Sequence, residues 1–192
     1  MGFDLQLGEY ACIKLDLKYK EGFGEQMMIR LTNRLYAIAK QVQEGASVAD
    51  IGTDHGYVPV YLIQNHIAKK VIATDIHQGP LKIAQKTIAE YGLQSHIELR
   101  LGNGLEVISP GEVGTVIVAG MGGLLIRDIL SQYIETARTI HRFILQPMNA
   151  QAELREWLLK NAFKIIHEEL AMEGQRIYEI IVAENGYQEI EE

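Results

Sequence analysis

The sequence has one cysteine, four prolines, one tryptophan and no long apolar run, and these scarcities exclude several classes of protein. Cys12 has no partner for an internal disulfide, which excludes a disulfide-stabilised secreted scaffold. No apolar run approaches the roughly 18 residues that span a bilayer, and the first residues lack the pattern of a signal peptide. With no closely spaced His pair either, no metal site is expected. We therefore expect a soluble, cytoplasmic protein without a metal.

Basic residues are also few, since 18 Lys and Arg face 25 Asp and Glu, a formal net charge of −7. A generic nucleic-acid binder would carry a basic surface. The excess of acids lies in residues 1–28 and 184–192, however, and the part between them is close to neutral. There Arg30, Arg34 and Lys40 meet no acid before Glu44. This locally basic segment is either a phosphate-binding surface or an ordinary solvated helix face.

Hydrophobic residues make up 47% of the 192 residues, enough for one large core. Strand-like runs alternate with amphipathic helical patterns, which is typical of a parallel sheet covered on both faces. The last two strand patterns have no helix between them and predict an antiparallel hairpin. The predicted strands are 47–51, 70–74, 97–101, 115–119, 142–145, 163–170 and 176–182, and the predicted helices are 31–42, 57–63, 79–91, 123–133 and 150–161.

The predicted fold class is therefore doubly wound α/β, with a mainly parallel, Rossmann-like sheet and a C-terminal antiparallel hairpin. Such a sheet is more typical of a methyltransferase than of a dehydrogenase. Residues 29–186 would form this domain, and residues 187–192 an acidic tail. Residues 1–28 would be an extension outside the core, because their strand-like alternation has no nearby partner strand. An open alternative is that translation begins at Met27 or Met28.

The segment Asp50–Gly56 (DIGTDHG) lies between the first buried strand and a helix, where glycines and backbone N–H groups can face a ligand. In open parallel sheets the ligand lies beyond the carboxyl ends of the strands. Asp75 ends the second strand, and a carboxylate there can accept hydrogen bonds from both hydroxyls of a ribose. The alternative for Asp75 is an acid that caps a turn or helix.

Two cofactor classes share this layout. A dinucleotide-binding loop would read G-x-G-x-x-G. This loop reads D-x-G-x-D-x-G, and Asp54 would bring negative charge towards phosphates. S-adenosylmethionine has no phosphate and carries a sulfonium cation, so the acids favour it over NAD.

Two further glycine-rich segments follow strands. Asn103 could accept a hydrogen bond from the amine of the cofactor adenine, or it could be a left-handed turn residue. The glycines at 120, 122 and 123 could leave room for a flat ring or a methyl donor, or could serve a backbone with positive φ. The predicted cofactor residues are Asp50, Gly52, Thr53, Gly56, Asp75, Ile76, Gly102, Asn103, Gly104, Ala119, Gly120, Met121 and Gly122.

These segments together resemble a known family, the bacterial tRNA (adenine-22-N1)-methyltransferases, over about residues 29–186. The resemblance rests on DIGTDHGYVP (50–59), DIHQGP (75–80), RLGNGLEVI (100–108), AGMGG (119–123), LQP (145–147) and LREWL (154–158). It implies an S-adenosylmethionine-dependent class I fold and an adenine in the D arm of tRNA as substrate.

The sequence departs from the family pattern at several places. Asn103 stands where the family typically has Asp, and Gly114 where it usually has an acid. The asparagine of the family's Gln-Pro-Asn comes one place later, as Asn149. The family also continues into a C-terminal helical coil beyond the position of Glu192.

Methylation at adenine N1 needs no covalent enzyme intermediate. With the resemblance, we predict that Asp54 stabilises the cationic adenine or accepts from its N6, that His55 orients Asp54 or the base, and that Tyr57 supports the pocket. Predicted tRNA contacts are Arg30, Arg34, Lys40, Lys69, Gln146, Pro147 and Asn149. The alternatives are a methyltransferase for another RNA or a small molecule, a non-catalytic cofactor-binding domain, and an NAD-dependent oxidoreductase.

Overall fold

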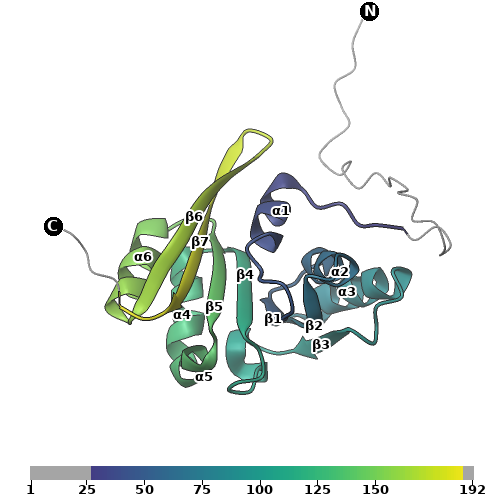
Figure 1. Ribbon diagram of the computed structural model, residues 1–192, viewed down its shortest axis with the longest axis horizontal. Coiled ribbons are helices and arrows are strands. Elements are labelled where there is room, and N and C mark those ends of the chain that lie inside the picture. Colours follow the sequence, from purple (N-terminus) through teal and green to yellow (C-terminus); the bar gives the residue numbers. More distant parts are fainter. Residues whose placement is uncertain (1–26, 188–192) are drawn as a thin grey trace, which may run out of the picture.

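The computed structural model describes residues 27–187. The described chain forms a seven-stranded sheet in the order β3-β2-β1-β4-β5-β7-β6 (Figure 1). The strands are β1 (Ala46–Ile51), β2 (Ala68–Asp75), β3 (Ile97–Leu101), β4 (Thr115–Met121), β5 (Arg142–Pro147), β6 (Phe163–Glu173) and β7 (Arg176–Asn185). The first five are parallel to one another, whereas β7 runs antiparallel to both β5 and β6. The predicted fold class is confirmed.

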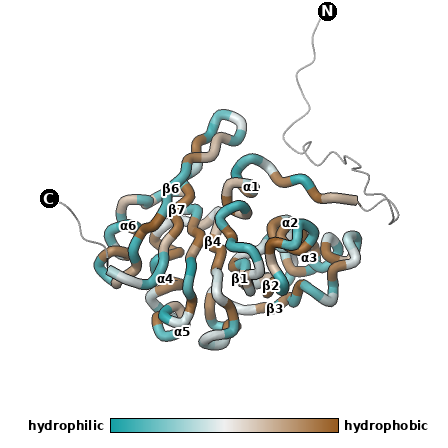
Figure 2. Tube along the Cα trace, viewed as in Figure 1, coloured by the Kyte–Doolittle hydropathy of each residue, from teal (hydrophilic) through white to brown (hydrophobic). Residues whose placement is uncertain are grey.

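Helices cover both faces of the sheet (Figure 1). They are α1 (Asn33–Ala39), α2 (Tyr57–Gln64), α3 (Gln78–Glu90), α4 (Gly123–Gln132), α5 (Ile134–Thr139) and α6 (Gln151–Lys160), with a 3₁₀ turn, η1 (Gly104–Val107). Neighbouring strand residues point to opposite faces. Val48 accordingly belongs to the apolar cluster that includes residues of α1, α2 and α3, and Ala49 to the cluster that includes residues of α4, α5 and α6. Apolar residues, brown in Figure 2, follow the central strand β4.

Most elements differ from prediction by a few residues at their ends, and three differences have a clear cause or consequence. The first helix begins at Asn33 because Thr32 caps it, with Oγ1 accepting from the backbone N of Leu35 at 3.4 Å. Strand β4 continues to Met121, so that part of the glycine-rich segment lies in the sheet. Helix α5 was not predicted; it follows Tyr133, whose extended φ and positive ψ interrupt the helical path after α4.

The C-terminal hairpin projects as an arm beyond the sheet, beside α1 (Figure 1). Polar contacts join the two. The Asn33 side chain donates to the carbonyl of Met172 (3.2 Å), and Lys40 Nζ lies 2.5 Å from Glu169 Oε1. Because β7 is antiparallel, its first residues reach the sheet edge at which β4 and β5 end. The arm thereby contributes to the site at that edge.

Parts of two predictions fall outside the described residues: 1–26 of the proposed extension and 188–192 of the proposed acidic tail. Within 27–187, no helix combines the length and apolar character needed to cross a membrane.

Candidate functional site

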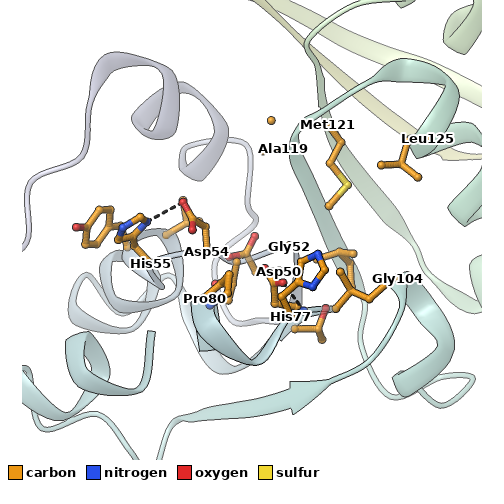
Figure 3. A pocket seen from close by; sticks show the side chains of 18 of the residues that line it. Asp50, Gly52, Asp54, His55, His77, Pro80, Gly104, Ala119, Met121 and Leu125 are labelled. Atoms are coloured by element: carbon orange, nitrogen blue, oxygen red, sulfur yellow. Dashed lines mark hydrogen bonds and ion pairs between the residues drawn. The ribbon is translucent and has the colours of Figure 1, made fainter. Parts of the chain in front are cut away.

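A pocket of about 850 Å³ lies at the carboxyl ends of the parallel strands (Figure 3). Its lining comes from the loops after β1, β2, β3 and β5, from the end of β4, from helices that include α1, α2 and α4, and from β7. Among the residues predicted for cofactor, catalysis or tRNA, it gathers Arg34, Asp50, Gly52, Thr53, Asp54, His55, Tyr57, Asp75, Ile76, Gly102, Asn103, Gly104, Ala119, Gly120 and Met121.

The loop after β1 is held tightly against the neighbouring strand. The backbone N–H groups of Gly52 and Thr53 both donate to the carbonyl of Thr74 at 2.9 Å. They are therefore engaged within the protein, contrary to the expectation that loop amides would face a ligand. Gly52 has φ +75°, and a Cβ there would lie 2.3 Å from Met121 Cε. The backbone conformation favours glycine here, whereas the nearby atom is the end of a flexible side chain that can move.

Asp50 is buried at the base of the pocket. Burial, together with the negative charge of Asp75, raises the pKa of its carboxyl to about 6. Two buried acids on one wall favour a ligand that brings positive charge. The two carboxyl groups therefore fit the sulfonium and amino groups of S-adenosylmethionine and do not fit the phosphates of a dinucleotide.

Asp75 ends β2 and is also buried. Its Oδ1 accepts a hydrogen bond from the backbone N of His77 at 2.8 Å. The turn-capping role considered as an alternative is therefore real. It occupies one carboxylate oxygen and leaves Oδ2 for a ligand hydroxyl, so the two roles are compatible.

Asp54 and His55 lie beside each other at the mouth of the pocket (Figure 3), and Tyr57 completes the cluster. His55 Nδ1 lies 2.7 Å from Asp54 Oδ2, and the imidazole stacks on Tyr57 with ring centroids 5.2 Å apart. Nδ1 must carry the proton, because an ionised carboxylate only accepts hydrogen bonds. Asp54 has φ +53°, unusual for a residue other than glycine, and its side chain is 65% exposed. The strained backbone holds a carboxylate where a ligand can reach it.

Asn103 lies at the pocket and is exposed. Its φ of −94° excludes the left-handed turn conformation considered for it; the left-handed residue is Gly104, with φ +58°. The backbone N of Asn103 donates to Glu106 Oε2 at 3.2 Å. The asparagine side chain remains a candidate for a ligand contact.

The glycines at the end of β4 and directly after it serve different purposes. A Cβ on Gly123 would lie 2.4 Å from the carbonyl oxygen of Ala150, and one on Gly122 would lie 3.0 Å from Asn149 Oδ1. These two glycines allow the loop after β5 to pack closely against this segment, and they do not line the pocket. Gly120 does line it and has φ +75°. Gly56, also predicted for the cofactor, lies outside the lining, packed on Ala84.

Gln146 lies behind the pocket wall and is fully buried. Its Oε1 accepts from Arg34 Nη1 (2.9 Å) and from the backbone N of Gly120 (3.2 Å), and its Nε2 donates to the carbonyl of Pro147 (2.9 Å). The amide is thus engaged in supporting the wall and is not directed at a bound base. Pro147 and Asn149 are likewise outside the lining.

Of the four predicted phosphate contacts, Arg34 alone lines the pocket. Lys40 is paired with Glu169, and Lys69 lies near the start of β2, at the opposite edge of the sheet from Asp75. Arg30 precedes α1 and is exposed. Sequence reasoning missed the pocket residues Thr32, Leu35, His77, Leu125, Met148 and Tyr178. Within residues 27–187 no cluster of three metal-ligating side chains occurs.

Comparisons with known proteins place the chain in a family. A family model described as a methyltransferase domain matches residues 31–181. A relative from Bacillus subtilis, tRNA (adenine(22)-N(1))-methyltransferase, is 42% identical over 158 residues, covering 82% of this chain and 66% of that protein. The chain therefore spans just under two thirds of that relative's length.

Solved structures with bound cofactor or product are similar too. A Streptococcus pneumoniae protein in complex with S-adenosyl-L-methionine has a TM-score of 0.82 and 36% identity, covering 84% of this chain and 76% of that one. A Mycoplasma capricolum enzyme in complex with S-adenosyl-homocysteine has a TM-score of 0.76 and 32% identity, covering 84% and 73%.

The domain is therefore a Rossmann-like methyltransferase domain. The order of the strands, the C-terminal hairpin, the acid-lined pocket and the match to the family model all indicate this class. Within that class, the chain belongs to the family of tRNA (adenine-22-N1)-methyltransferases.

Proposed function

We propose that this protein transfers a methyl group from S-adenosylmethionine to N1 of an adenine in tRNA, at position 22 of the D arm, in the cytoplasm. The observation that carries the proposal is the placement of Asp54, paired with His55, at the mouth of a pocket whose base is lined by the buried acids Asp50 and Asp75. The similarity to the Bacillus subtilis enzyme supports this substrate.

The cofactor side of the pocket would use three polar residues. Asp75 would accept from the ribose hydroxyls through its remaining oxygen, Asn103 would accept from the adenine amine, and Asp50 would balance the positive charge of the methionine part. The cofactor supplies an electrophilic methyl group on a sulfonium. Isothermal titration separates this assignment from the NAD alternative: S-adenosylhomocysteine should bind and NADH should not.

The protein's part in the reaction is alignment and charge stabilisation. N1 of the adenine would gain the methyl group that the cofactor releases, which leaves S-adenosylhomocysteine and makes the purine cationic. Good alignment of the reacting atoms is worth roughly 7 to 11 kcal/mol of barrier. The Asp54 carboxylate would stabilise the developing charge and accept from N6. His55, donating through Nδ1 and stacked on Tyr57, would hold that carboxylate in place. The target base must leave its stack to reach this position.

The charge layout of the pocket also suggests how the nucleotide is oriented. Acids lie on the loops after β1 and β2, whereas Arg34 lies on the wall formed by α1. A base that becomes cationic is favoured beside Asp54, and a phosphate beside Arg34. The guanidinium would therefore contact the backbone of the nucleotide whose base faces the acids.

The function is tested by incubating the protein with labelled S-adenosylmethionine and tRNA, followed by nucleoside analysis for 1-methyladenosine. Replacing Asp54 with Ala should lower kcat by about 100-fold or more, the loss typical of one electrostatic group at a transition state. Asp128→Ala, an exposed acid paired with its neighbour Arg127, serves as the matched control. Transfer by Asp54→Ala at the wild-type rate would contradict the role given to this carboxylate.

A further inference from the structure

The wall of the pocket opposite the loops after β2 and β3 contains an aromatic residue from the C-terminal arm. Tyr178 is the third residue of β7, and it lines the pocket together with Leu35 of α1 and Met148, which follows β5. The side chain of Met148 is exposed, and Tyr178 is half-buried. This wall is therefore largely apolar and partly open, whereas the acids lie on the other loops.

Arg34 holds the tyrosine ring in a defined position. Its guanidinium carbon lies 5.2 Å from the centroid of the Tyr178 ring, and its Nη1 donates to the buried Gln146. The backbone N of Arg34 donates to Glu173 Oε2 at 3.2 Å, and Nε lies 4.0 Å from Glu173 Oε1. Three elements thus fix one guanidinium and one aromatic ring beside each other. Such rigidity reduces the entropy lost when a ligand binds.

A fixed aromatic surface next to a cation matches the chemistry of an unstacked nucleotide. Aromatic side chains stack on bases of any sequence, and arginine binds phosphate. The two requirements of the target nucleotide, a flat apolar surface for the base and a cation for the phosphate, are met on this wall. The cofactor, with its positive charge, is better matched to the acids of the other loops.

We propose that Tyr178 is the stacking surface for the tRNA base that is methylated, and that Arg34 positions its ring. This inference rests on the proposed function and adds a residue that neither the motifs nor the sequence resemblance indicated. The hairpin then contributes directly to substrate binding, because the antiparallel course of β7 carries Tyr178 to the edge where the parallel strands end.

The test compares Tyr178→Leu, which keeps an apolar side chain but removes the flat ring, with Tyr178→Phe, which keeps the ring. Loss of one base–aromatic stack should raise KM for tRNA about 5- to 100-fold in Tyr178→Leu. Tyr178→Phe should stay within about 3-fold of wild type, and Kd for S-adenosylhomocysteine should be unchanged in both. Ile177→Ala, the preceding and more exposed hairpin residue, is the control and should retain the wild-type KM.

A second measurement uses the wild-type protein and so does not depend on a variant's folding. Transfer RNA with 8-azidoadenosine at the target position is irradiated on the protein with bound S-adenosylhomocysteine, and the adduct is mapped by mass spectrometry. An adduct on Tyr178 is expected, and adducts confined to residues 102–104 would overturn the proposal. An active wild type with an unchanged KM in Tyr178→Leu would overturn it as well, as would a matching loss of S-adenosylhomocysteine binding. A wild type that transfers no methyl group to tRNA would instead overturn the proposed function on which it rests.

Discussion

At the scale of single residues, the pocket places side chains in environments that would be unfavourable without a ligand. Asp50 is the clearest case, since its carboxyl is buried and close to Asp75. The backbone of Asp54 is also in an unfavourable conformation, with φ +53°. Asp50 lies near the end of β1 and Asp54 in the loop that follows, where the glycines have positive φ. The local cost of these features is expected where a site is organised to bind charge.

The buried Asp50 leads to a prediction about pH. Its pKa is raised from 3.8 to about 6 in the folded protein, so the folded state binds this proton more tightly than the unfolded chain. Ionised Asp50 therefore reduces stability, increasingly as pH rises from about 4 to about 6. Asp50→Asn should raise the free energy of unfolding of the cofactor-free protein by up to ~3 kcal/mol at pH 8 and by only ~1 kcal/mol at pH 4.5.

Urea unfolding at the two pH values measures this difference, and titration with S-adenosylhomocysteine should show weakened binding in the same variant. A variant less stable than wild type at both pH values would show that the Asp50 carboxylate is instead satisfied within the folded protein.

At the scale of elements, the glycine-rich segment after β4 joins two neighbouring loops. The backbone N of Gly123 donates to the carbonyl of Asn149 at 2.9 Å, and that of Met148 donates to the carbonyl of Met121 at 2.7 Å. Gly123 also begins α4, where the loop after β5 passes directly over it. The segment is therefore primarily a packing device that aligns the ends of β4 and β5.

Substituting Gly123 by Ala should consequently destabilise the fold. The added Cβ would lie 2.4 Å from the carbonyl of Ala150, a backbone atom that cannot move away as a flexible side chain could. Overpacking of this kind costs about 1 to 3 kcal/mol. Gly79→Ala is a matched control in the first turn of α3, where nothing lies within 4 Å of the new Cβ. It should be neutral or stabilise by up to about 1 kcal/mol. Thermal unfolding of the two variants measures the contrast, and equal melting temperatures would refute it.

At the scale of the whole molecule, the net charge of −7 opposes nonspecific binding to nucleic acid. Several basic side chains are committed to intramolecular pairs, such as Lys70 with Glu98 and Arg142 with Glu184. Recognition of tRNA would then depend on a small number of phosphate contacts and on the shape of the pocket. Affinity should accordingly fall only moderately as salt increases.

The salt dependence of tRNA binding by an Arg34 variant tests this expectation. If its guanidinium contacts one phosphate, Arg34→Gln should reduce the slope of log K against log salt by about 0.7 to 1. Lys160→Gln, an exposed base of α6 paired with Glu156, should leave the slope unchanged. Binding of tRNA in the presence of S-adenosylhomocysteine at several salt concentrations provides the slopes. An unaltered slope in Arg34→Gln would assign the guanidinium to supporting Gln146 and Tyr178 alone.

The sequence by itself determined the succession of strands and helices along the chain, apart from α5, as well as the hairpin and the acids at or just after the ends of the first two strands. These features follow from local information: periodicity sets which residues are buried, and a strand's carboxyl end carries the residue that follows it. Asp50, Asp54 and Asp75 are therefore found at the pocket, as their positions after strands predict.

Only the tertiary structure decided which distant residues complete that pocket. Strand β7 inserts between β5 and β6 in antiparallel orientation, and this places Tyr178 beside Arg34, 144 positions earlier in the chain. The amide of Gln146 likewise bonds to Arg34, Gly120 and Pro147 behind the pocket wall, although the family resemblance predicted a tRNA contact for it. Hydrogen bonds and ring contacts between segments far apart in sequence leave no periodic signal in either segment, and so they become apparent only when the chain is folded.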